Sequence, residues 1–170
     1  MWTYRGQNRP EFAKEPGPGQ ESVWDYPRPP EIEPDGREVV VTHQGDVIAK
    51  SKRAVRVLET ASPPTFYIPP EDVRWEMLVP AQGSSVCEWK GRARYWALAA
   101  DPGKGPVGWS YPDPTPAFAS IKDFVSFYPA AVECRVNGER VRPQPGRFYG
   151  GWVTREIIGP FKGEPGTQGW

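Results

Sequence analysis

The chain has 170 residues, with 21 basic and 21 acidic side chains, so its formal net charge is zero. A balanced charge provides no field that would attract nucleic acid or an acidic membrane, and we expect neither as a partner. No apolar run approaches the ~18 residues that a membrane-spanning helix requires, and the first residues lack the apolar stretch of a secretory signal. These features predict a cytoplasmic protein.

Composition favours a compact fold with much irregular backbone. The 22 Pro and 18 Gly residues favour turns, whereas the 8 Trp, 7 Tyr and 7 Phe residues are typical of a chain with a core. Cys87 and Cys134 form neither a metal-ligand pattern nor a disulfide framework. We therefore expect two small reduced residues, no metal and no other cofactor.

Residues 1–23 are polar and rich in Pro and Gly, and we predict an arm that lies over the body through its aromatic residues. A first unit is predicted at 24–100. Its β-branched and alternating segments indicate short strands joined by turns. The predicted strands are 37–42, 47–49, 53–59, 65–68, 74–79 and 92–100, with a loop at 81–85.

A Pro- and Gly-rich linker is predicted at 101–108, and a second unit at 109–170. This unit contains the one predicted helix, 117–128, which Thr115 would cap. The helix is predicted from an amphipathic stripe made of Phe118, Ile121, Val125 and Tyr128. Strands are expected at 131–135, 139–141 and 152–158, the first two joined by the hairpin turn Asn137-Gly138.

Several short motifs occur twice, in the same order in both halves of the chain. Trp24-Asp25-Tyr26-Pro27 returns as Trp109-Ser110-Tyr111-Pro112, and Trp89-Lys90-Gly91 returns as Phe161-Lys162-Gly163. Such repetition predicts two like units packed about a pseudo-twofold axis, with a ligand site at the seam. Because the chain would then contain its own pseudo-dimer, we expect a monomer. The predicted fold class is mainly β, with two tandem related units and one short helix.

Five stretches together resemble the bacterial domain of unknown function 427 family, in its longer, duplicated form. They are Arg53–Glu59, Tyr67–Val73, Cys87–Gly91, Trp109–Pro112 and Phe148–Trp152. The resemblance covers essentially residues 1–170 and implies two β-tent-like units with a cavity where they meet. It implies no accepted activity. Some β-tent proteins bind zinc through Cys pairs, but this chain has no Cys-x-x-Cys.

The nucleotidyltransferase-like name under which such chains are sometimes filed has no support in these residues. The sequence has no Gly-Ser followed by paired Asp residues for two metal ions, and no glycine-rich phosphate loop.

Aromatic residues are the strongest candidates for a ligand site. Aromatic rings on a concave seam can sandwich a flat ring or surround a cation, although most Trp and Tyr residues of any domain are core. Lys90 lies in one of the matched Lys-Gly turns and would contact a carboxylate or phosphate, unless it is a solvated turn residue. The predicted ligand-binding residues are Tyr67, Lys90, Trp96, Trp109, Tyr111, Tyr149 and Trp152.

Glu59 is the candidate catalytic residue. A carboxylate at a strand end facing an apolar cavity can transfer protons, whereas a salt bridge to Arg53 or Arg56 is the structural alternative. Glu76 and Glu156 are expected to be surface residues. The one histidine, His43, follows a strand with no nucleophile nearby, and we expect it to be an exposed polar residue.

Three hypotheses for function follow from these residues. The first is a protein that binds an unidentified small molecule between the two units. The second is a metal-free enzyme that acts on a small cyclic compound with Glu59 as acid or base. The third is an interaction module that presents the Pro-rich segments around Trp24 and Trp109 to another protein. The third requires the Trp-x-Tyr-Pro motifs to be accessible.

Overall fold

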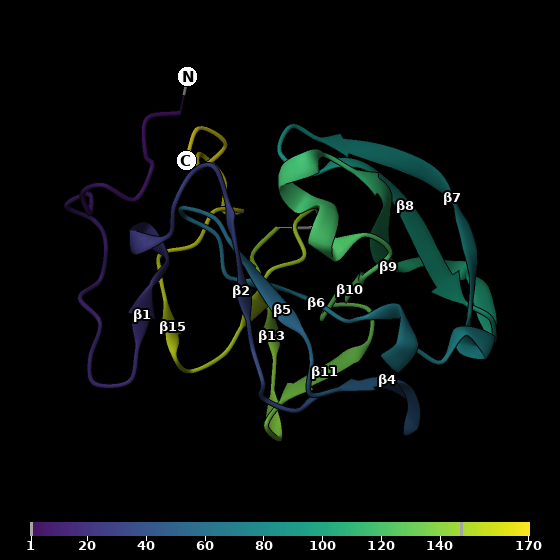
Figure 1. Ribbon diagram of the computed structural model, residues 1–170. Helices are drawn as coiled ribbons and strands as arrows, with labels where there is room; N and C mark the ends of the chain where they lie inside the picture. The colour runs from purple at the N-terminus through teal and green to yellow at the C-terminus, as the bar shows by residue number, and fades with distance from the viewer. Residues whose placement is uncertain (1, 147) are drawn as a thin grey trace.

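The computed structural model describes residues 2–146 and 148–170, and it confirms the mainly β fold class (Figure 1). Within these residues the strands form several sheets rather than one. The sheet of β7, β8 and β9 lies on one side of the molecule, and the N-terminal arm with β1 and β15 lies on the other. None of the helices in the described part of the chain is both long and apolar enough to cross a membrane.

One four-stranded antiparallel sheet has the strand order β10-β9-β8-β7. Its strands are β7 (Leu78–Cys87), β8 (Gly91–Leu98), β9 (Asp101–Pro114) and β10 (Val125–Phe127). Gly91 begins β8 with φ +110, and a Cβ at this position would lie 3.2 Å from the carbonyl oxygen of Asp113. Glycine therefore allows the chain to leave the β7–β8 turn close against β9.

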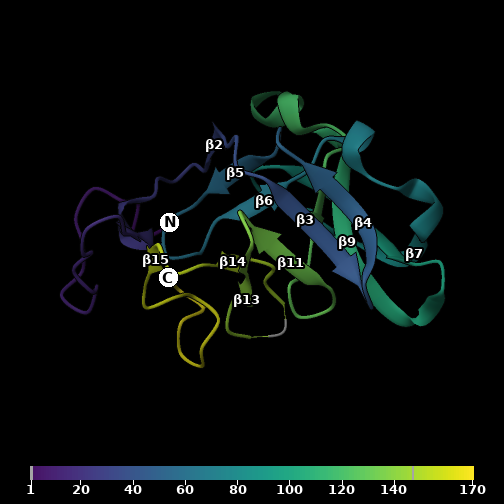
Figure 2. The same ribbon diagram turned by 90° about the horizontal axis from the view of Figure 1, so that it is seen from below.

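The second four-stranded sheet has the order β12-β11-β3-β4 and follows the predicted hairpins (Figure 2). Its strands are β3 (Val39–His43), β4 (Asp46–Ser51), β11 (Glu133–Val136) and β12 (Glu139–Arg140). Gln44-Gly45 and Asn137-Gly138 have positive φ at both residues, which gives two-residue turns whose twist matches that of the strands. The hairpin predicted at Asn137-Gly138 is confirmed, and Gln44-Gly45 joins the predicted strands 37–42 and 47–49 in a second hairpin.

The remaining strands form smaller sheets. One sheet contains β2 (Glu31–Pro34), β5 (Val55–Leu58) and β6 (Thr65–Tyr67). A two-stranded sheet joins β1 (Glu21–Ser22) to β15 (Ile157–Ile158). Another joins β13 (Arg142–Pro143) to β14 (Trp152–Val153). The helical segments are short 3₁₀ turns. They are η1 (Val23–Asp25), η2 (Pro70–Asp72), η3 (Trp75–Met77) and η4 (Pro116–Ile121).

The predicted helix 117–128 is wrong. The segment is the 3₁₀ turn η4 followed by strand β10, with Phe118 outside helical geometry and Asp123 at φ +65. Thr115 does not cap the turn, because its hydroxyl donates to the carbonyl oxygen of Trp89. Val125 pairs with Ser110 of β9, and tertiary strand pairing therefore overrides the local helical pattern.

Two segments expected to be irregular belong to long strands. Residues 101–108, predicted as a linker, form the first part of β9 and pair with β8. Residues 81–85, predicted as a loop, lie within β7, where the pairing register shifts between Ala81 and Ser84. Such a bulge accommodates Gly83 at φ +92 without ending the strand. Both segments are extended because neighbouring strands satisfy their backbone groups.

The structure does not confirm the tandem duplication. β11 of the second half pairs with β3 of the first, and β9 pairs with β8, so sheets combine strands from both halves. The matched motifs also differ in conformation, since Trp24 lies in the 3₁₀ turn η1 and Trp109 lies in strand β9. The motifs around Trp24 and Trp109 therefore do not occupy equivalent structural positions.

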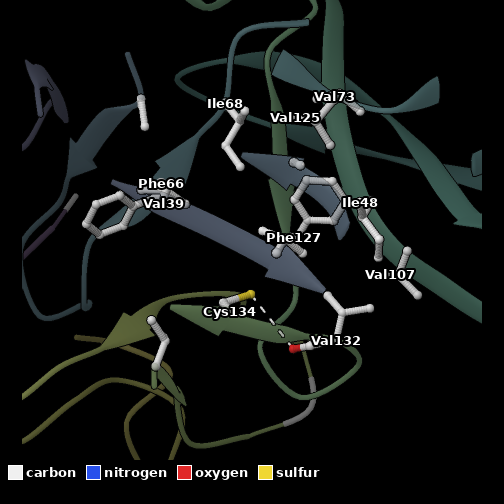
Figure 3. Packing of buried hydrophobic residues seen from close by; sticks show 14 of the residues in the cluster. Val39, Ile48, Phe66, Ile68, Val73, Val107, Val125, Phe127, Val132 and Cys134 are labelled. Atoms are coloured by element: carbon white, nitrogen blue, oxygen red, sulfur yellow. Dashed lines mark hydrogen bonds between the residues drawn. The ribbon is translucent and has the colours of Figure 1, made fainter. Parts of the chain in front are cut away.

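The main core lies between these sheets and is aliphatic and aromatic (Figure 3). Val39, Ile48, Phe66 and Phe127 are buried there, and the Cys134 thiol contacts the Val132 carbonyl oxygen at 3.8 Å. A separate cluster joins the arm and the C-terminal segment to the body. It contains the edge-to-face and stacked rings of Tyr4, Phe12, Trp24 and Trp170.

Candidate functional site

A cavity of about 700 Å³ lies against one face of the β7–β8–β9 sheet. Alternate residues of a strand share a face, so Ala93 and Tyr95 of β8 lie beside Trp109 and Tyr111 of β9 on the cavity side. Other lining residues come from β5, β6 and the segments 143–146 and 148–151. The cavity therefore takes its lining from both halves of the chain.

Six of the eight candidate residues line this cavity. They are Glu59, Tyr67, Lys90, Trp109, Tyr111 and Tyr149. The structure thus brings together residues that are up to 90 positions apart in the sequence (Glu59 to Tyr149). Tyr67 and Trp109 are joined directly, since the indole N–H donates to the Tyr67 hydroxyl at 3.2 Å.

Trp96 and Trp152, the other two candidates, do not line the cavity. Trp96 follows Tyr95 on β8 and therefore faces the other side of the sheet, where its indole N–H donates to the Ser110 hydroxyl at 2.9 Å. Trp152 is fully buried in the main core, stacked on Phe66 with ring centroids 4.9 Å apart. Both indoles serve packing, which corrects their predicted place in the cavity wall.

Among the described residues that line the cavity, Lys90 is the cation, and only 9% of the residue is exposed. Its Nζ lies 6.0 Å from the Tyr111 ring centre and 5.9 Å from that of Phe118. Burial lowers the pKa of Lys90, but Tyr67, Cys87 and Glu59 outweigh burial and hold that pKa above its ordinary value. The amine is therefore charged at neutral pH.

The tyrosine hydroxyls beside Lys90 are neutral hydrogen-bonding groups. Burial, followed by the neighbouring Tyr67 and Cys87, raises the pKa of Tyr111. Tyr128, at the other end of the cavity, has its pKa raised mainly by burial as well. These side chains can donate a hydrogen bond to a ligand but are not bases at neutral pH.

Glu59 borders the cavity but is engaged in an ion pair. Its Oε2 accepts from Arg28 Nε at 3.1 Å, and the Arg28 side chain is only 1% exposed. Arg28 also donates to the backbone oxygens of Tyr4 and Trp170, at 3.1 and 2.6 Å. The carboxylate therefore pairs with a buried guanidinium that ties the arm and the C-terminal segment to the body, and neither Arg53 nor Arg56 is its partner.

Trp2 of the arm covers part of the cavity and was missed by sequence reasoning. Its ring lies between two cations, with Arg28 Cζ 4.1 Å and Lys162 Nζ 4.8 Å from its centre. Its indole N–H donates to Glu88 at 3.0 Å. Burial and the neighbouring Arg28 lower the pKa of Lys162. No local signal in the sequence indicates this position, because every partner of Trp2 is distant along the chain.

Further cavity residues missed from the sequence are Cys87, Trp89, Tyr95 and Tyr128. The alternation of β8 and its pairing with β9 would have placed Tyr95 beside Trp109. Trp89 is notable because its buried indole N–H has no acceptor within the described ranges. A buried donor without a partner is costly in general.

Other candidates lie away from this cavity. His43 is half-buried at the end of β3, and Glu76 is exposed. Glu156 pairs with Arg37 at 2.6 Å. No group of three or more His, Cys, Asp or Glu side chains with metal-binding geometry occurs in residues 2–146 and 148–170.

The Trp-x-Tyr-Pro motifs, on which the interaction-module hypothesis depends, are buried. Trp24 and Tyr26 lie in the cluster with the arm, and Trp109 and Tyr111 lie in the cavity wall. These residues therefore offer no accessible surface for a protein partner, and they give that hypothesis no support.

Comparison with known proteins places this chain in a family. No curated protein is significantly similar to it. A family model described as "Domain of unknown function (DUF427)" matches residues 31–138, which is more than half of the chain. The matched segment includes Glu59, Tyr67, Lys90, Trp109 and Tyr111 of the cavity. The chain therefore belongs to the DUF427 family.

Proposed function

We propose that the protein binds a small organic molecule in the cavity on the β7–β8–β9 sheet. The observation that carries this proposal is a cavity of about 700 Å³ that combines an aromatic wall with a buried amine. This volume lies within the range typical of sites for small molecules, roughly 300–1,000 Å³.

The composition of the wall supports a largely apolar ligand. Tyr95, Trp109 and Tyr128 present ring surfaces, and Trp109 and Tyr128 already contact each other with ring centroids 4.6 Å apart. A flat or aliphatic molecule would bury its surface against these rings. The few polar groups, chiefly Lys90 and the Tyr67 hydroxyl, would fix its orientation.

The proposal is tested by filling the cavity from within. Ala93 is buried in the cavity wall, so Ala93→Phe directs a phenyl ring into the space that a ligand would occupy. The matched control is Ala99→Phe, because Ala99 is exposed and lies outside the cavity. We expect the wild-type protein and Ala99→Phe to bind the fluorescent apolar probe N-phenylnaphthylamine equally, and Ala93→Phe to bind it roughly ten-fold more weakly or worse.

Thermal unfolding must show that Ala93→Phe is folded before its binding is interpreted. If the folded Ala93→Phe variant binds the probe as tightly as wild type, the cavity is not the binding site. If the wild-type protein does not bind the probe at all, the proposed function loses its support.

A further inference from the structure

The cavity is polar at one end and apolar at the other. Lys90 and Cys87 lie at the β7–β8 turn, next to Gly91, which pairs with Pro114 of β9. Farther along β8, Ala97 pairs with Pro106, which lines the cavity. Six residues of extended strand separate Gly91 from Ala97, which corresponds to about 20 Å. The far end is lined by Pro106, Pro129, Ala130 and Ala131, together with the ring of Tyr128.

The polar end contains a lysine amine without a carboxylate in contact among the described residues. In the part of the chain that the structure describes, no carboxylate oxygen lies within 4.0 Å of Lys90 Nζ. The neighbouring Trp89 has a buried indole N–H without an acceptor. The amine is charged and lines the cavity, so an anion bound there could make a charge-assisted contact with it.

The charges around this end leave a positive excess. Three cations, Arg28, Lys90 and Lys162, surround two carboxylates, Glu59 and Glu88. Glu59 is bound by Arg28 at 3.1 Å, and Glu88 is an exposed residue that accepts from Trp2. Neither Lys90 nor Lys162 has a carboxylate oxygen within 4.0 Å in the described residues, and of these two Lys90 lines the cavity.

We propose that the ligand is an organic monoanion with an elongated apolar body, bound with its acid group at Lys90 and its body along β8 and β9. This inference rests on the proposed function and adds the class of the ligand. The charged amine of Lys90 can pair with one acid group. The rings of Tyr95, Trp109 and Tyr128 cover the body, and the Pro106 end receives its terminus.

Two fluorescent probes that share one ring system distinguish the contribution of charge to the binding affinity from that of apolar contact. Anilinonaphthalenesulfonate carries one sulfonate, whereas N-phenylnaphthylamine has the same rings and no charge. In Lys90→Met, which keeps the length of the side chain and removes its charge, we expect the affinity for the anionic probe to fall roughly ten-fold or more. The affinity for the neutral probe should stay within about two-fold. Lys122→Met, at an exposed lysine outside the cavity, should change neither affinity.

The shape of the ligand is tested with alkanoates that displace the neutral probe. Each added methylene should tighten binding about four-fold until the cavity is full. If acetate competes as well as decanoate, the elongated body is refuted. If Lys90→Met weakens both probes equally, or neither, the anion site is refuted while the cavity itself stands. Loss of neutral-probe binding in the wild-type protein would instead overturn the proposed function. Should Lys90→Met fail to fold, Lys90→Gln replaces it in the same comparison.

Discussion

Removing the Arg28 guanidinium should destabilise the protein strongly. Arg28→Met deletes the 3.1 Å ion pair with Glu59 and the hydrogen bonds to the backbone oxygens of Tyr4 and Trp170. Because the Arg28 side chain is 1% exposed and that of Glu59 is 23% exposed, the carboxylate is left partly buried without a counter-charge. Removing one partner of such a buried ion pair typically lowers the free energy of unfolding by about 3–5 kcal/mol. For a chain of this size, this cost corresponds to a decrease in Tm of roughly 6–20 °C.

Thermal unfolding followed by circular dichroism measures this loss of stability. A double-mutant cycle with Glu59 shows how much of the loss comes from the unpaired carboxylate. Glu59→Gln in the Arg28→Met background removes the uncompensated charge, so the double variant should be more stable than Arg28→Met alone. If Arg28→Met lowers the free energy of unfolding by less than about 1 kcal/mol, as an exposed ion pair would, the buried role of Arg28 is refuted.

Two other changes test the core and the ion-pair network. Trp152→Ala should lower the free energy of unfolding, measured in urea, by about 3–5 kcal/mol, because Trp152 is fully buried and stacked on Phe66. The substitution should leave the cavity wall intact. A decrease below about 1 kcal/mol would contradict the core position of Trp152. Burial raises the pKa of Asp35, but hydrogen bonds from Arg37 outweigh it and hold that pKa below its ordinary value. The ionised Asp35 carboxylate therefore contributes fully to the stability of the folded protein above about pH 4, and this contribution is lost as the pH falls further. A urea titration should show that Arg37→Met reduces this acid-dependent loss, and an unchanged pH profile would contradict the pairing.

Much of the fold could be predicted from local patterns. Period-two alternation and the Asn137-Gly138 turn signal act over a few residues, and strands of the central sheets form close to where these signals place them. The helix predicted at 117–128 failed because its apolar spacing also suits a strand, and pairing with β9 decided between the two. The Pro- and Gly-rich segment 101–108 likewise becomes a strand only because β8 lies beside it.

The candidate site was predictable in its chemistry but not in its detail. An excess of aromatic residues and a Lys-Gly turn pointed to Trp109 and Lys90, which line the cavity. Trp152 carries the same signal, yet it is core, because the face of a residue on a two-residue strand depends on long-range packing. Trp2 reaches the cavity from the arm through contacts with Arg28 and Lys162, and no pattern within the arm specifies such distant partners.

A crystal structure of the protein with bound anilinonaphthalenesulfonate tests the central claim most directly. The account predicts that the probe occupies the cavity, with its rings against Tyr95 and Trp109 and its sulfonate within hydrogen-bonding distance of Lys90 Nζ. A probe bound elsewhere on the surface, with the cavity closed by side chains, would contradict it.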